Sequence, residues 1–169
     1  MPRQARRARI TLGIDPGVAS TGIGAVEEKD GVYRSLGYDC IRTFPTELFV
    51  RRLALLNAEC AKAIRKYRPE SIAMERLFFA RNAKTAIAVG QAQGALLLAA
   101  AGADMDVTFY TPNEVKSATT GDGSSDKAGV ALMIQKILGL EEIPKPDDAA
   151  DALAIAYCHL VSTRQKGRK

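Results

Sequence analysis

Residues 10–28, "ITLGIDPGVASTGIGAVEE", contain two apolar segments on either side of a short turn. The first six residues are typical of a buried strand, and the Pro-Gly pair at 16–17 ends it. Residues 20–28 and residues 32–43 have the pattern of two further strands, and the Asp-Gly pair at 30–31 between them is a hairpin signal. The beginning of the chain therefore predicts three strands in a meander.

Beyond Thr46 the apolar residues recur every three or four positions, which is typical of a helix. The elements expected from there are a helix as far as Pro69, a strand at 71–76, a helix at 82–101, a strand at 105–110, a short helix within 111–125, a helix at 126–138 and a final helix from Pro146. Strands followed by alternating helices and strands predict one α/β domain, with a mixed five-stranded sheet and helices on both faces. We assign residues 1–9 to a basic N-terminal extension, 10–162 to the domain and 163–169 to a basic C-terminal tail.

The charge of the chain favours an anionic partner. The formal net charge is +5 and the isoelectric point is about 9.2, which fits either a nucleic-acid-binding protein or a merely soluble basic one. Cys40, Cys60 and Cys158 include no C-x-x-C pair, which argues against a zinc site or a disulfide framework and favours reduced thiols. The chain has no apolar run of the roughly 18 residues that a membrane span needs and no secretory signal, so we expect a cytoplasmic protein.

Two carboxylates stand at strand ends. Asp15 ends the first strand and Glu75 lies at the end of the fourth. If these strands are parallel neighbours, both side chains lie at the edge of the sheet where ligands bind in open α/β folds. Each residue alone also fits a plainer role, Asp15 as a turn residue before Pro-Gly and Glu75 as a solvated charge.

The final helix adds three more carboxylates, in "KPDDAADALAIAYC" at residues 145–158. On its own this stretch is typical of acids that face a helix dipole. Asp151 is about 60° from Asp148 and about 40° from Asp147 around the helix axis, so spacing alone does not choose between them. The arc of apolar residues on the helix favours Asp148 over Asp147, because Asp148 borders this arc and Asp147 points away from it. We therefore expect Asp148 and Asp151 to face the sheet edge, and His159, about 12 Å further along, to pack or to support rather than to bind a metal.

A cluster of three or four carboxylates cannot stay ionised without cations. Oxygen ligands of this kind select Mg²⁺ or Mn²⁺, and two such ions about 4 Å apart can activate a water and stabilise the leaving oxygen of a phosphodiester. The acids therefore suggest phosphodiester hydrolysis.

The motifs "LGIDPG", "AMERLFFARNAKTAIAVGQAQG" and "DDAADALAIA", in this order and spacing, closely resemble those of the RuvC Holliday-junction resolvases. The resemblance covers nearly all of the chain from Ile10 to His159. It implies a ribonuclease H-like fold and a homodimer that cuts four-way DNA junctions symmetrically in recombination and repair. It also implies Mg²⁺ or Mn²⁺ and cooperation with the RuvA and RuvB branch-migration proteins. The family's four catalytic and metal-binding acids fall on Asp15, Glu75, Asp148 and Asp151, while Asp147 is an additional acid.

The resemblance also implies residues that contact DNA. It places a base-contacting aromatic at Phe78 and DNA-contacting lysines at Lys116 and Lys127, the latter at a helix start where backbone N–H groups favour phosphate. Aromatics among basic residues suit unpaired bases, whereas Phe in general packs in a core, the role we expect for Phe79. The residues assigned to DNA binding are Arg76, Phe78, Arg81, Asn82, Lys84, Lys116 and Lys127.

Three questions stay open at this point. "GIDPGVASTG" also resembles the phosphate-binding turn of actin-like and sugar-kinase ATPases, although those proteins need a second domain for which this chain is too short. A non-catalytic junction-binding protein is a further alternative, but such a protein would not need all four acids. Gly90 and Gly94, one helical turn apart, mark a close approach either within the subunit or at a two-fold interface.

Overall fold

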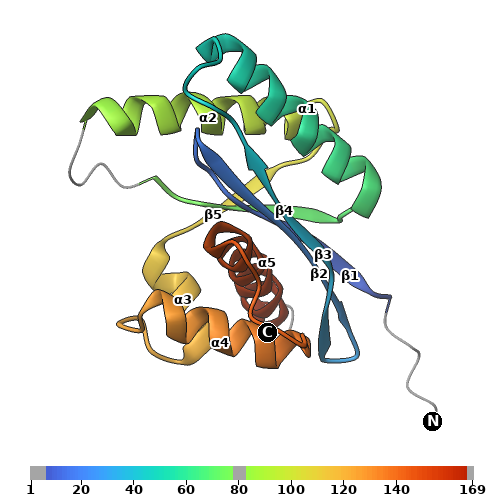
Figure 1. Ribbon diagram of the computed structural model, residues 1–169. Helices are drawn as coiled ribbons and strands as arrows, with labels where there is room; N and C mark the ends of the chain where they lie inside the picture. Colours follow the sequence, from blue (N-terminus) through green and yellow to red (C-terminus); the bar gives the residue numbers. More distant parts are fainter. Residues whose placement is uncertain (1–6, 78–82, 167–169) are drawn as a thin grey trace.

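The computed structural model describes residues 7–77 and 83–166, and it places a five-stranded sheet between two layers of helices (Figure 1). The strands are β1 (Arg9–Asp15), β2 (Ser20–Lys29), β3 (Val32–Arg42), β4 (Ser71–Glu75) and β5 (Val107–Tyr110). The helices are α1 (Phe49–Tyr67), α2 (Ala83–Ala101), α3 (Pro112–Thr120), α4 (Lys127–Leu138) and α5 (Asp147–Lys166). The predicted mixed five-stranded sheet with helices on both faces is confirmed.

The strand order is β3-β2-β1-β4-β5, with β1 at the centre. The meander of β1, β2 and β3 is antiparallel, whereas β1 and β4, and β4 and β5, run parallel. Asp30 and Gly31 form the hairpin with positive φ angles of 53° and 89°, a conformation that Asp and Gly tolerate better than other residues. The parallel pairing of β1 with β4 is the arrangement that brings the ends of these two strands to one edge of the sheet.

The two faces of the sheet are covered differently. Helices α1 and α2 pack on one face around large aliphatic side chains such as Leu12, Leu56 and Leu96 (Figure 1). Helix α5 lies across the other face, and α3 and α4 pack against it. Its core includes Ile134 and Leu153 together with many alanines.

Glycines let α5 approach the sheet closely. A Cβ atom on Gly13 of β1 would lie 2.0 Å from the main-chain oxygen of Ala152, and one on Gly22 of β2 would lie 1.8 Å from that of Asp148. Neither position has room for a side chain, so the backbone of α5 rests directly on these strands. The first turn of α5 is thereby held beside the end of β1.

Several boundaries differ from prediction. Helix α1 begins at Phe49 rather than near residue 46, and Pro146 precedes α5 rather than forming its first residue. Helix α5 continues to Lys166, so the first four residues of the segment that we assigned to a tail are helical. Arg9 of the assigned extension lies in β1, where its guanidinium donates to Glu28 and Thr163. The contact with Thr163 ties the start of β1 to the end of α5, and the sequence of neither segment alone reveals it.

All three cysteines are free thiols, as expected; Cys60 and Cys158 are buried and Cys40 is half-buried. Within residues 7–77 and 83–166, no helix is both long enough and apolar enough to cross a membrane.

Candidate active site

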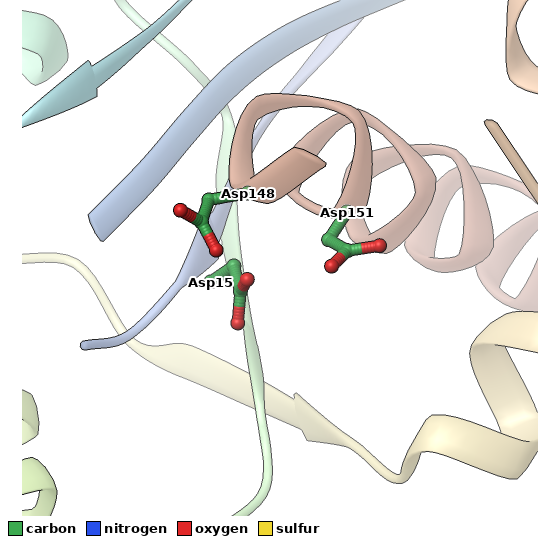
Figure 2. Close-up of side chains that lie close together, drawn as sticks. All are labelled: Asp15, Asp148 and Asp151. Carbon is green, nitrogen blue, oxygen red and sulfur yellow. The ribbon is translucent and has the colours of Figure 1, made fainter. Parts of the chain in front are cut away.

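Three carboxylates converge where β1 ends (Figure 2). Asp15 is the last residue of β1, and Asp148 and Asp151 lie in the first two turns of α5. Each offers one oxygen such that all three oxygens lie within 4.8 Å of one another. Because Gly13 and Gly22 let α5 sit on the sheet, short aspartate side chains are long enough to meet here.

Glu75 lies at the same edge of the sheet. Residue Ala73 of β4 is paired in parallel with Gly13 of β1, so Glu75 and Asp15, two residues further along each strand, project from the same face. Glu75 lines a pocket of about 290 Å³ together with Asp15, Asp151, Lys116 and Lys127. It is not part of the tight group of three oxygens, but it shares a pocket with two of its members.

The cluster resists full ionisation. Burial, and then the negative charges of Glu75, Asp151 and Asp148, raise the pKa of Asp15 from 3.8 to about 8. Burial and the charge of Asp151 also raise the pKa of Glu75, against the opposing effect of Lys127 and Lys116. At neutral pH the protonated form of Asp15 is therefore favoured, and full ionisation of the cluster requires added positive charge.

Lys127 supplies part of the missing positive charge. Its Nζ donates to Asp151 Oδ2 at 2.7 Å, and this hydrogen bond raises the pKa of the lysine. The helix start beside it is not a free anion site, because the Asp126 carboxylate caps α4 by accepting from the backbone N–H of Gly129. Phosphate binding by this helix start, which the sequence suggested, is therefore opposed by a capping carboxylate.

Asp147 lies apart from the group. It is exposed, and it lines a neighbouring hollow of about 330 Å³ with Ile143 and Ala150 as well as Lys127 and Asp151. Its carboxylate is not among the three whose oxygens converge. Of the two adjacent acids, Asp148 therefore joins the cluster and Asp147 does not, as the apolar arc of α5 predicts.

Two polar contacts near α5 were missed from the sequence. The hydroxyl of Ser20, the first residue of β2, donates to Asp148 Oδ2. Further along α5, the buried His159 pairs through Nδ1 with the hydroxyl of Tyr110 at 3.0 Å. The position of Ser20 just after the "GIDPG" turn places it near Asp15. Its contact with Asp148 could not be predicted, because the two residues are 128 positions apart in the sequence. His159 is buried, and it is not among the three residues of the carboxylate group.

The predicted DNA-contacting residues fall into two sets. Arg76 is exposed just after Glu75, and its backbone N–H donates to the carbonyl oxygen of Tyr110. Lys116 and Lys127 line the carboxylate pocket. The other predicted residues, Phe78, Arg81 and Asn82, lie outside the described residues, as does Phe79; Lys84 belongs to the first turn of α2, and its side chain is also outside them.

The donor atoms suit a hard divalent cation. The group of three offers carboxylate oxygens only, with no thiolate or imidazole, and Glu75 adds another carboxylate nearby. A cation would also offset the effects of burial and of neighbouring negative charge, which together raise the pKa of Asp15. The residues therefore fit a divalent metal centre at the end of β1.

Comparisons with known proteins agree with one another. The family model described as crossover junction endodeoxyribonuclease RuvC matches residues 11–159. A protein of that name from Moorella thermoacetica is 53% identical over 150 residues, which cover 89% of this chain and 90% of the relative. The structure of Thermus thermophilus RuvC superimposes with a TM-score of 0.86 at 40% identity, covering 93% of this chain and 96% of that one. The structure of T. thermophilus RuvC in complex with Holliday junction substrate gives a TM-score of 0.85 at 38% identity, with 92% and 96% covered.

Proposed function

The chain belongs to the RuvC family of crossover junction endodeoxyribonucleases, and we propose that it resolves four-way DNA junctions by hydrolysing two phosphodiester bonds symmetrically. The observation that carries this proposal is the convergence of Asp15, Asp148 and Asp151 at one edge of the sheet, with Glu75 beside them. Carboxylates grouped in this way can hold the divalent ions that catalyse phosphodiester hydrolysis. An ATP-binding role fits less well, because the Thr21 hydroxyl is buried and donates to the carbonyl oxygen of Gly17 within the turn.

The metal is proposed to be Mg²⁺ or Mn²⁺, with two ions held by Asp15, Glu75, Asp148 and Asp151. When bound, such ions activate a water for attack and stabilise the leaving oxygen of the phosphodiester. The chain's own part is to hold the carboxylates in place: β1 and β4 fix Asp15 and Glu75, and the close approach of α5 fixes the other two. Lys127, paired with Asp151, keeps the site partly neutralised before other cations arrive.

The DNA surface is proposed to lie around this pocket. Arg76, Lys116 and Lys127 would contact phosphates, and Phe78 would stack on an unpaired base at the branch point. Arg81, Asn82 and Lys84 would add contacts from the segment that follows Glu75. Lys116 and Lys127 support this assignment because they line the pocket that contains the acids.

The test is a synthetic four-way junction with labelled strands, incubated with Mg²⁺, with Mn²⁺ or with a chelator, beside a linear duplex of the same sequence. We expect paired nicks at symmetric positions in the junction only, and only with metal. Equal cutting of the linear duplex would contradict junction selectivity, and cutting in the presence of chelator would contradict metal dependence.

We further propose that the chain acts as a homodimer through α2. Ile87 and Leu98 on this helix are 63% and 69% exposed, and a Cβ atom on Gly94 between them would contact nothing within 4 Å. Gly94 therefore does not serve close packing within the subunit, one of the two alternatives left open. It lines an open hollow with Leu98 and with Leu53 of α1, and an exposed apolar stripe beside such a hollow suits a second copy. Two copies related by a two-fold axis would present two sites to the two opposed strands of a junction.

Sedimentation of Leu98→Glu tests the dimer. The unaltered chain is expected to sediment as a dimer and the variant as a monomer with an unchanged circular dichroism spectrum. Leu132→Glu is the matched control, because Leu132 is also exposed but lies on α4. A dimeric Leu98→Glu protein would contradict the proposed interface.

Cooperation with RuvA and RuvB, and action in the cytoplasm, are proposed from family membership alone. Co-sedimentation of the chain with a RuvA–RuvB–junction complex tests the former, and a complex that excludes the chain would contradict it. Fluorescence microscopy of a tagged chain that co-localises with the nucleoid would support the latter.

A further inference from the structure

Ser20 connects a candidate metal ligand to a thiol. Its hydroxyl donates to Asp148 Oδ2, and its Oγ lies 2.9 Å from the sulfur of Cys40. Ser20 and Cys40 are both half-buried and lie on the neighbouring strands β2 and β3. The three side chains therefore form a continuous path from the edge strand of the sheet to the carboxylate cluster.

The sheet register explains why these side chains meet. Gly22 is paired with Cys40 across β2 and β3, and Ser20, two residues before Gly22, projects from the same face. This is the face on which α5 rests, since a Cβ atom on Gly22 would lie 1.8 Å from the main-chain oxygen of Asp148. Ser20 is thus placed directly beneath the first turn of α5, within reach of the Asp148 side chain.

The number of protons on each group determines which group donates in each hydrogen bond of the path. An ionised carboxylate only accepts hydrogen bonds, and a serine hydroxyl has one proton to donate. The proton of Ser20 is therefore committed to Asp148, so a hydrogen bond between Ser20 and Cys40 requires the thiol to donate. The carbonyl oxygen of Ile41, 4.0 Å from the sulfur, is a second and more distant acceptor for the thiol proton. The path runs from the Cys40 S–H to the Ser20 O–H to the Asp148 carboxylate.

Such a contact restricts the orientation of Asp148. One of its oxygens is turned toward Asp15 and the other away from it (Figure 2). A hydroxyl bonded to one oxygen limits rotation of the carboxylate and leaves lone pairs of the other free for a cation. We propose that Ser20 is a positioning residue that holds Asp148 for metal binding, and that Cys40 orients Ser20. This inference rests on the proposed function and concerns residues that the family resemblance does not assign.

The test compares Ser20→Ala, which removes the hydroxyl, with Ser20→Thr, which keeps it. Mn²⁺ binding to the DNA-free protein is followed by the electron paramagnetic resonance signal of free Mn²⁺, and junction nicking is measured at each Mn²⁺ concentration. Loss of a residue that orients a metal ligand is expected to weaken Mn²⁺ affinity about tenfold, whereas Ser20→Thr should stay within about threefold. Ser71→Ala is the matched control, because its hydroxyl bonds Thr11 in the same sheet without touching a carboxylate.

Two results would overturn the inference. One is a Ser20→Ala protein, folded by circular dichroism, that binds Mn²⁺ as tightly as the unaltered chain. The other is a Ser20→Thr protein as impaired as Ser20→Ala, since the hydroxyl would then not be what matters. An unaltered chain that binds Mn²⁺ but nicks no junction contradicts the proposed function and leaves the Mn²⁺ comparison for Ser20 valid, whereas one that binds no Mn²⁺ contradicts both.

Cys40 has its own test with N-ethylmaleimide. Burial raises the pKa of the Cys60 thiol to about 12 and that of Cys158 to about 11, so Cys40 is expected to react first. Alkylation removes the thiol proton and adds bulk beside Ser20, so Mn²⁺ affinity should fall at least as far as in Ser20→Ala. Cys40→Ser keeps a donor and should bind Mn²⁺ normally before and after the reagent. Normal affinity after complete alkylation of Cys40 would remove this residue from the path.

Discussion

The two faces of the sheet are packed by different means. Under α1 and α2, large side chains such as Leu12, Ile23 and Leu56 fill the space between sheet and helices. Under α5 the glycines of β1 and β2 bring the backbones into contact, and alanines such as Ala152 and Ala156 maintain the short spacing. The first face is a conventional aliphatic core, whereas on the second face a seam of small residues lies between α5 and the strands β1 and β2.

The difference follows from what the α5 face carries. Aspartate is short, so Asp148 and Asp151 can meet Asp15 only if their helix lies close to the strand. Side chains the size of leucine at Gly13 or Gly22 would lift α5 from the sheet and separate the oxygens. We infer that close packing on this face serves the geometry of the carboxylates and packing on the other serves mainly the stability of the fold.

Removing a carboxylate from the α5 face should give the largest effect on cleavage. Asp15→Asn, Glu75→Gln, Asp148→Asn and Asp151→Asn are each expected to slow junction nicking by roughly 10³-fold or more, because each is proposed to bind metal. Junction binding, measured by gel shift in chelator, should persist because phosphate contacts supply the affinity.

Asp147→Asn is the matched control for that series, since Asp147 is an exposed acid on the same turn outside the group of three. It should retain most of the nicking activity. If Asp147→Asn abolished nicking while Asp148→Asn spared it, the assignment of the two adjacent acids would be reversed.

Adding one methyl group to the seam should lower the free energy of unfolding more than removing one from the aliphatic core. In Gly22→Ala the new Cβ would meet the backbone of Asp148, which cannot move aside as a side chain can, so we expect a loss of roughly 3 kcal/mol in the free energy of unfolding together with reduced nicking. Ile23→Val, the next residue on the opposite face, should lose only about 1 kcal/mol and nick normally. Urea unfolding and single-turnover nicking measure both; equal losses in the two variants would show that the faces are not packed differently.

Without metal, the carboxylate cluster should weaken the fold as pH rises. The pKa of Asp15 is about 8 in the fold against 3.8 as its ordinary value, so the stability from its protonated form is complete below about pH 4 and is lost as pH rises toward 8. Asp15→Asn has no such group, so in chelator at pH 8 its Tm should exceed that of the unaltered chain by about 3 °C or more. The difference in Tm should vanish near pH 4. Mn²⁺ should raise the Tm of the unaltered chain more than it raises that of Asp15→Asn. A constant Tm difference across this range would argue against the raised pKa.

Sequence periodicity predicted those parts of the site that depend on one strand or one helix. The end of a buried strand identified Asp15, and the apolar arc of α5 distinguished Asp148 from Asp147, because both patterns are local. Asp15 and Glu75 lie at one edge of the sheet only because β1 and β4 pair in parallel. The sequence argument had to assume this pairing, and the structure shows it.

Contacts between distant segments were not predictable in this way. The bond from Ser20 to Asp148 depends on β2 and α5 packing face to face, and the pair of Lys127 and Asp151 depends on where α4 sits against α5. Neither follows from spacing along the chain. The extent of α5 was missed for a related reason, since its last turns are fixed by Arg9 at the start of β1 rather than by their own sequence.

The smallest expected effect concerns DNA affinity on the two faces. Lys116 on α3 lines the carboxylate pocket, whereas the exposed Lys62 lies on α1 across the sheet. If Lys116 contacts one phosphate, Lys116→Ala should weaken junction binding several-fold in chelator and reduce the slope of log K against log salt concentration by about 1. Lys62→Ala, which removes the same charge from the other face, should leave the slope unchanged. Fluorescence anisotropy across a salt series measures both slopes, and equal slopes for the two variants would mean that net charge, rather than a phosphate contact beside the acids, sets the affinity.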